Sequence, residues 1–311
     1  MPDPEIASPI GGDSAAPAQA PLPAGWLADH PWITFLLPFL LFMVATSFEP
    51  TPPPQFEGDE TGQESTLADE TPEPFFDPNG EGMFPINYSY YPQVYTAKIA
   101  LVLLAMALVW PGYRTFPLRV SVLSVVVGVV GVVFWIVLCH LRLEPKLVGP
   151  VDRFLGSIVN MLPGLEGNEN PSIGLMSMLG TGERSAFNPL ERMSSNPLAA
   201  WTFLGVRFIG LALIVPVIEE FFLRGFIMRY LVHEKWWQVP FGAVNRTALI
   251  AGTAVPMLMH PAELLASLVW FSMVTWLMLR TRSIWDCVVA HVVTNFLLGV
   301  YVVAFDQWQL M

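Results

Sequence analysis

Polar residues of types that suit hydrolysis interrupt three apolar stretches in the last third of this 311-residue chain. Ionisable side chains inside a bilayer cost roughly 3 kcal/mol each, so their presence there indicates a function. The candidate site residues are Glu219, Glu220, Arg224, His260, His291 and Asn295.

Their spacing assigns them different tasks on helices. Glu220 and Arg224 are four residues apart and can form an ion pair on one helix face. Glu219 projects roughly 100° away from Glu220, which leaves its carboxylate available. His291 and Asn295 are also four residues apart, so both side chains lie on one face.

Together these groups can activate and position a water molecule. An apolar environment makes a carboxylate a better general base, so Glu219 is the candidate base and His260 can share the same water. His291 and Asn295 can donate hydrogen bonds to a developing oxyanion. A single histidine in a membrane helix is more often a helix-contact residue. The prediction therefore depends on the polar residues of all three apolar stretches meeting at one place. No serine or cysteine lies beside a base, so a covalent nucleophile is not evident.

The metal content is left open by the sequence. Glu219, His260 and His291 would supply the two-histidine, one-carboxylate ligand set of a catalytic divalent metal such as zinc. The helical His-Glu-x-x-His pattern is absent from the sequence. We favour water activation without a cofactor.

Composition predicts a polytopic membrane protein. Hydrophobic residues make up 53% of the chain, charged residues only 13%, and the mean hydropathy is +0.51. No basic patch supports nucleic-acid binding. Cys139 and Cys287 both lie in apolar segments, so neither a disulfide framework nor a thiolate zinc site is expected.

The elements that must position the site are predicted to form an all-α transmembrane bundle of about seven to eight spans. We expect a disordered tail at 1–30, N-terminal membrane helices at 31–141 with an acidic, proline-rich loop at 49–96, an extramembrane loop at 142–198 and a catalytic core at 199–304. The loop at 142–198 contains an amphipathic helix at 152–162. An eighth span arises if the helix at 198–232 divides near Pro216. The predicted spans are 32–48, 97–111, 119–141, 198–232, 247–260, 262–279 and 284–304.

These motifs resemble those of the CPBP family of intramembrane proteases, which includes the CAAX prenyl endopeptidases. The resemblance rests on Glu-Glu-xxx-Arg with its continuation Phe-Phe-Leu-Arg-Gly at 221–225, on His260, and on His291-xxx-Asn295. It covers about residues 199–304. The divergent N-terminal part resembles, more loosely, bacterial CAAX protease-related proteins.

The resemblance implies an intramembrane endopeptidase with the roles given above, in which Glu220 and Arg224 hold the geometry of the site. It also implies contact with membrane lipid, a peptide or membrane-anchored protein substrate that can be lipidated, and a multi-pass protein of a bacterial inner membrane. The family often has Phe four residues before its second-motif histidine. Pro256 stands there in this chain and predicts a bend in the helix that carries His260.

Two other functions fit the same residues. A non-proteolytic membrane scaffold or immunity-type binding protein would keep the polar core for stability and use the acidic loop at 49–96 to bind its partner. A proton-coupled transporter would use buried Glu and His as a relay. The lack of an evident internal repeat counts against the transporter.

Overall fold

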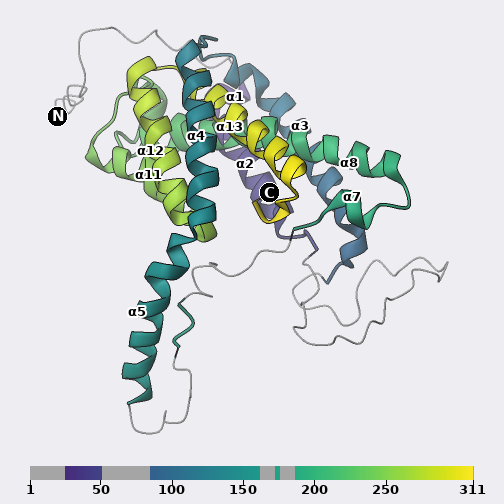
Figure 1. The fold of residues 1–311 in the computed structure, drawn as a ribbon. Coiled ribbons are helices and arrows are strands. Elements are labelled where there is room, and N and C mark those ends of the chain that lie inside the picture. Colours follow the sequence, from purple (N-terminus) through teal and green to yellow (C-terminus); the bar gives the residue numbers. More distant parts are fainter. Residues whose placement is uncertain (1–24, 51–84, 162–171, 176–185, 311) are drawn as a thin grey trace, which may run out of the picture.

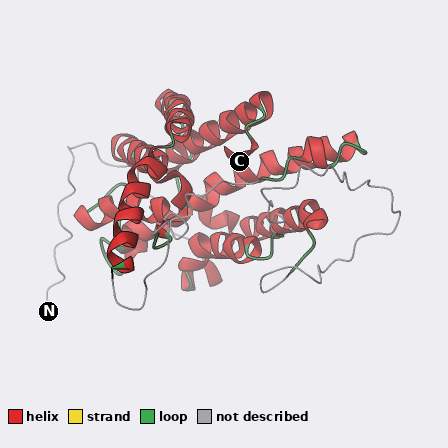
Figure 2. Ribbon diagram, turned by 60° about the horizontal axis from the view of Figure 1, so that its bottom comes forward, coloured by secondary structure: helices red, strands yellow, loops and turns green. Residues whose placement is uncertain are grey.

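The computed structural model describes residues 25–50, 85–161, 172–175 and 186–310, and this part of the chain is all-α (Figure 1). Most of the predicted tail at 1–30 and of the acidic loop at 49–96 lies outside the described residues. The described end of the tail forms a short helix, α1 (Trp26–Asp29), and is therefore not disordered as predicted. Figure 2 shows helices joined by short connections throughout the described chain.

The N-terminal helices pack against one another and against the C-terminal half. Helix α2 packs along α3, and α4 packs against both α12 and α13. Helix α3 begins six residues before the predicted span, because the tyrosines ahead of it continue the helix. The bounds are α2 (Trp32–Thr46), α3 (Tyr91–Tyr113), α4 (Val122–Leu141) and α5 (Leu143–Asn160).

The central helix runs without a break from Pro197 to Tyr230, so Pro216 does not divide it into two spans. It contains two π-helical segments, which commonly occur at functional sites. Asn196 caps its start by accepting a hydrogen bond from Ala199 N at 3.1 Å. Its segments are α8 (Pro197–Ile209), η2 (Gly210–Ile214), α9 (Val215–Glu220), η3 (Phe221–Ile227) and α10 (Met228–Tyr230).

The last three helices lie within a few residues of their predicted bounds. They are α11 (Arg246–Met259), α12 (Leu264–Thr281), which follows the turn η5 (Pro261–Glu263), and α13 (Ile284–Phe305). Ser283 caps α13 by accepting from Asp286 N, and the Asp286 carboxylate accepts from Ser121 N at 2.6 Å. Asp286 therefore fastens α13 to the start of α4.

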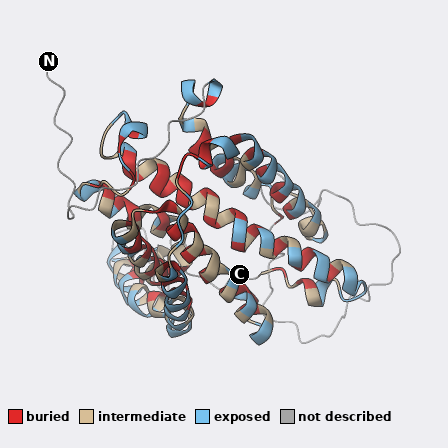
Figure 3. Cartoon of the chain, turned by 90° about the horizontal axis from the view of Figure 1, so that it is seen from above, coloured by how far each residue is buried: buried red, intermediate tan, exposed pale blue. Residues whose placement is uncertain are grey.

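Five helices of the described chain are long and apolar enough to cross a membrane. Helices α2 and α11, which were predicted as spans, are apolar but have only 15 and 14 residues. Buried residues lie on the faces that helices turn toward one another, and many outward faces are exposed (Figure 3). On α4 these exposed residues include Val126, Val133 and Val137, which suits contact with lipid.

Helix α5 is longer than the amphipathic helix predicted at 152–162. It begins at Leu143, nine residues before the expected start, because Glu144 is buried and accepts a hydrogen bond from Leu265 N of α12 at 2.9 Å. Beyond this contact α5 projects away from the other helices (Figure 1).

Candidate active site

Glu219 and Glu220 end α9 and occupy different environments, as their directions on the helix predict. The side chain of Glu220 is fully buried, whereas that of Glu219 is 14% exposed. One carboxylate thus faces the helix contacts and the other faces a cavity.

Both oxygens of Glu220 are engaged. Arg224 donates from Nη1 to Glu220 Oε2, which forms the ion pair expected from their spacing. The same guanidinium reaches the backbone carbonyl of Phe271 at 3.5 Å. Glu220 Oε1 lies 3.0 Å from Nδ1 of His291, which comes from α13. Because a carboxylate paired with arginine accepts hydrogen bonds, Nδ1 of His291 carries the proton.

His291 connects the two carboxylates. Its Nε2 lies 4.0 Å from Oε2 of Glu219, which is longer than a direct hydrogen bond. A ring edge of Trp270 packs on the imidazole, with centroids 5.9 Å apart. The imidazole of His291 is therefore held by Glu220 at Nδ1 and directs its Nε2 toward Glu219.

His260 follows the last residue of α11, where the helix has ended. Its Nδ1 lies 2.8 Å from the carbonyl oxygen of Pro256, so Nδ1 donates and Nε2 keeps its lone pair. Trp135 of α4 contacts the ring edge-on at 5.8 Å. The Pro256 carbonyl, left open where the helix ends, therefore orients the histidine, and the bend at Pro256 stays a prediction.

Phe271 links the two histidines. Its ring centroid lies 5.7 Å from that of His260 and 6.1 Å from that of His291. Phe271 also lines a pocket together with Glu219. Side chains from α9, α11, α12 and α13 therefore meet around one aromatic ring.

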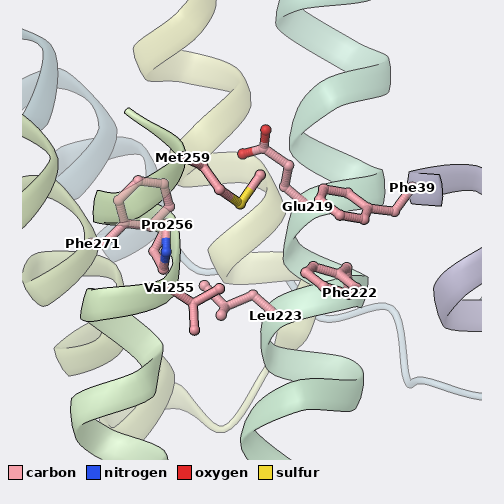
Figure 4. A pocket seen from close by; sticks show the side chains of 8 residues that line it. All are labelled: Phe39, Glu219, Phe222, Leu223, Val255, Pro256, Met259 and Phe271. Atoms are coloured by element: carbon pink, nitrogen blue, oxygen red, sulfur yellow. The ribbon is translucent and has the colours of Figure 1, made fainter. Parts of the chain in front are cut away.

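The pocket beside Glu219 has room for about one water molecule, and its empty space of about 220 Å³ includes open solvent. Figure 4 shows the Glu219 side chain reaching from its helix toward Met259, with the other side chains around it. All of those other side chains are apolar, so Glu219 brings the only carboxylate to this lining. They are Phe39, Phe222, Leu223, Val255, Pro256, Met259 and Phe271.

Asn295 lies one turn beyond His291 but bonds elsewhere. Its Nδ2 donates to the carbonyl of Leu211 at 2.9 Å. In the π register of η2, Val215 N donates to Gly210 O, so the Leu211 carbonyl would accept from residue 216. Pro216 has no N–H, and the Asn295 amide takes its place.

Residues 201–297 match the family described as Type II CAAX prenyl endopeptidase Rce1-like. The match covers about a third of the chain, and we call these residues the Rce1-like segment. No curated protein and no solved structure matches the chain. All six predicted site residues lie inside the Rce1-like segment, which extends from α8 to α13. With five helices of membrane-spanning length, the chain is an integral membrane protein.

The Rce1-like segment does not supply the whole site. Phe39 of α2 lines the pocket and Trp135 of α4 contacts His260, and both lie before the matched residues. Nothing in their local sequence distinguishes them from other aromatic residues in apolar helices. Phe222 lies in the Phe-Phe-Leu-Arg-Gly stretch that carries the resemblance, but that stretch does not predict its contact with the pocket.

Glu219, His260 and His291 of the Rce1-like segment are the predicted metal ligands. Among the described residues, no three His, Cys, Asp or Glu side chains form a group that could hold a metal ion. The Glu219, His260 and His291 side chains thus do not form a ready ligand set in this arrangement.

Proposed function

We propose that this protein is an intramembrane endopeptidase in which Glu219, His260 and His291 act on one hydrolytic water. The observation that carries the proposal is the contrast between the two carboxylates. Glu220 is buried and fully engaged, while Glu219 lies partly exposed in an apolar pocket with His291 Nε2 4.0 Å from its carboxylate. Two acceptors at that separation leave room for a bridging water rather than a direct bond.

The reaction follows from the available groups. Glu219 takes a proton from the water as its oxygen attacks the scissile carbonyl carbon, and a tetrahedral oxyanion forms. The lone pair of His260 Nε2 orients the same water. The C–N bond then breaks, and the proton held by Glu219 goes to the leaving amine. Glu220 and Arg224 keep His291 in place throughout.

The oxyanion would be stabilised by His291 and Asn295. His291 donates from Nε2 only when the ring carries both protons, because Nδ1 already donates to Glu220. The Asn295 amide has two N–H groups, and Leu211 accepts from one of them. The second remains for the substrate.

The pocket favours an apolar ligand. Its seven other lining side chains are hydrocarbon, aromatic or thioether groups. A membrane-anchored peptide, with an apolar side chain or a lipid chain beside the cleaved bond, would pack against these side chains. We propose a bacterial inner membrane as the location of such a substrate, as the looser resemblance to bacterial CAAX protease-related proteins implies.

The decisive test is hydrolysis by the full chain in vesicles. Membrane-anchored peptides with and without a prenyl group on cysteine would be supplied, and the products identified by mass spectrometry. We expect Glu219→Gln and His260→Ala each to lower the rate by at least about 10²-fold. Glu234→Gln makes the same chemical change as Glu219→Gln at an exposed residue and should leave the rate unchanged.

Full activity of Glu219→Gln would overturn the proposal. If this variant keeps the cellular function while deletion of the acidic loop removes it, the scaffold function holds instead. We further propose water activation without metal. Metal analysis of the purified chain and activity in chelator test this point, and loss of activity that zinc restores would contradict it.

A further inference from the structure

An exposed apolar stripe runs along α5, the helix that projects from the bundle (Figure 1). Its members recur at alternating spacings of four and three residues, which places them on one helix face. Their exposed fractions run from 47% to 80%. They are Leu147, Val151, Phe154, Ile158 and Met161.

The exposed charges of α5 and of the residue before it are all positive. Arg142, Lys146 and Arg153 are exposed, whereas Glu144 and Asp152 are buried. Lys146 also donates to the backbone carbonyl of Leu141 at 2.8 Å. Lys146 and Arg153 are seven residues apart and therefore flank the apolar stripe on the same side.

The two acidic side chains are buried and accept hydrogen bonds within the chain. Glu144 accepts from Leu265 N, at the start of α12. Asp152 accepts from Ser172 Oγ at 2.7 Å and from the backbone N–H groups of Ile173 and Leu175 at 3.1 Å. The surface that α5 presents outward is therefore apolar and cationic.

The position of α5 relative to the bilayer follows from α4. The 20 residues of α4 extend about 30 Å, the thickness of the hydrocarbon core. Arg142, with φ of 45°, interrupts the helix between α4 and α5. Helix α5 thus begins at the level of the lipid headgroups, in continuity with the lipid-facing surface of α4.

A bilayer suits this surface better than a second copy of the chain. The stripe has the spacing of a coiled-coil seam, but Lys146 and Arg153 would bring like charges to its edge. Gly149, Pro150 and Gly156 also disfavour a long soluble coiled coil. An apolar stripe flanked by cations is typical of helices that lie in an anionic membrane surface.

We propose that α5 is an anionic-lipid-binding helix. In the structure α5 continues away from the end of α4 (Figure 1), and lipid binding bends it further at Arg142 into the membrane plane. Phe154 and its neighbours then insert at the acyl boundary, and Lys146 and Arg153 lie against anionic headgroups. This inference rests on residues outside the Rce1-like segment and does not depend on the proposed hydrolysis.

The test uses the full chain in vesicles of phosphatidylcholine, alone or mixed with phosphatidylglycerol. Cys139→Ser removes the less buried native thiol, and the buried Cys287 stays. An environment-sensitive fluorophore is attached at Ile158→Cys or at Asn160→Cys, which lies two residues on and faces the other way. Nitroxide lipids then report the depth of each label.

We expect quenching at position 158 to exceed that at 160 by severalfold in the anionic vesicles. Replacing Lys146 and Arg153 by Gln should lower the ratio of docked to undocked helix about fivefold for each charge in anionic vesicles, and not in phosphatidylcholine alone. Equal quenching at both positions, or charge-independent quenching, would overturn the proposal. Disulfide cross-linking through Ile158→Cys without quenching would overturn it in favour of a second copy.

Discussion

At the residue scale, neighbouring glutamates differ because a helix turns them toward different surroundings. Glu220 faces Arg224 and His291 and has no exposed side-chain surface. Glu219 faces an apolar pocket. The same side-chain type therefore has a structural task at one position and a proposed chemical task at the next.

This difference predicts that the same substitution destabilises the protein much more at Glu220 than at Glu219. Glu220→Gln leaves the buried guanidinium of Arg224 without a counter-charge, which should cost about 3 to 5 kcal/mol in unfolding free energy. Glu219→Gln should cost less than about 1 kcal/mol because the Glu219 carboxylate lies 4.0 Å from His291 Nε2, too far for a direct hydrogen bond. Unfolding in detergent, followed by circular dichroism, measures both. Equal stability of the two variants would contradict the assignment.

Trp135 is expected to position His260 through its edge-on contact at 5.8 Å. Trp135→Ala removes that support and should lower kcat, by up to roughly 10²-fold, with little change in KM. Trp135→Phe keeps an aromatic edge and should restore much of the rate. A merely structural role would instead lower the amount of folded enzyme and leave kcat per folded molecule unchanged.

At the element scale, the central helix depends on a partner from another helix. The π segment η2 leaves the Leu211 carbonyl to Asn295 of α13 because residue 216 is proline. This contact fixes the rotation of α13 and hence the approach of His291, which lies one turn away on the same face.

Asn295→Leu should therefore leave a backbone carbonyl unpaired and cost about 1 to 3 kcal/mol. Adding Pro216→Ala supplies an N–H at residue 216, and the double variant should recover part of this loss. Chemical denaturation of the single and double variants gives the interaction free energy. Purely additive effects would show that the amide and the missing N–H are not coupled.

At the scale of the whole molecule, the Rce1-like segment depends on helices outside it. Helix α4 packs closely on α12 and α13, and a Cβ at Gly131 would overlap the ring of Trp270. Trp270 in turn packs on His291. The N-terminal helices thus support the site through their packing.

Gly131→Ala should force α4 away from Trp270 and destabilise the protein by about 1 to 3 kcal/mol. Gly205→Ala is the matched control, because a Cβ there would meet no described atom within 4 Å. In the interior of α8, Gly205→Ala should raise the free energy of unfolding by up to about 1 kcal/mol. The melting temperatures of both variants measure this difference. Equal values would contradict close packing at Gly131.

Features that depend on residues near one another in the chain could be predicted from the sequence. Apolar length predicted the spans to within a few residues at α4, α12 and α13, and the spacing of Glu220 and Arg224 predicted their pair. Local interactions within one helix are set by its periodicity. The predicted start of α5 was wrong, because the observed start depends on the hydrogen bond between Glu144 and α12, which is distant in the sequence.

The contacts between groups on different helices could be seen only in the tertiary structure. The contact of His291 with Glu220, the bond of Asn295 to Leu211, and the places of Phe39 and Trp135 depend on how helices distant in the chain cross and rotate. Those angles result from side-chain packing between helices, and such packing leaves no periodic mark on a single sequence.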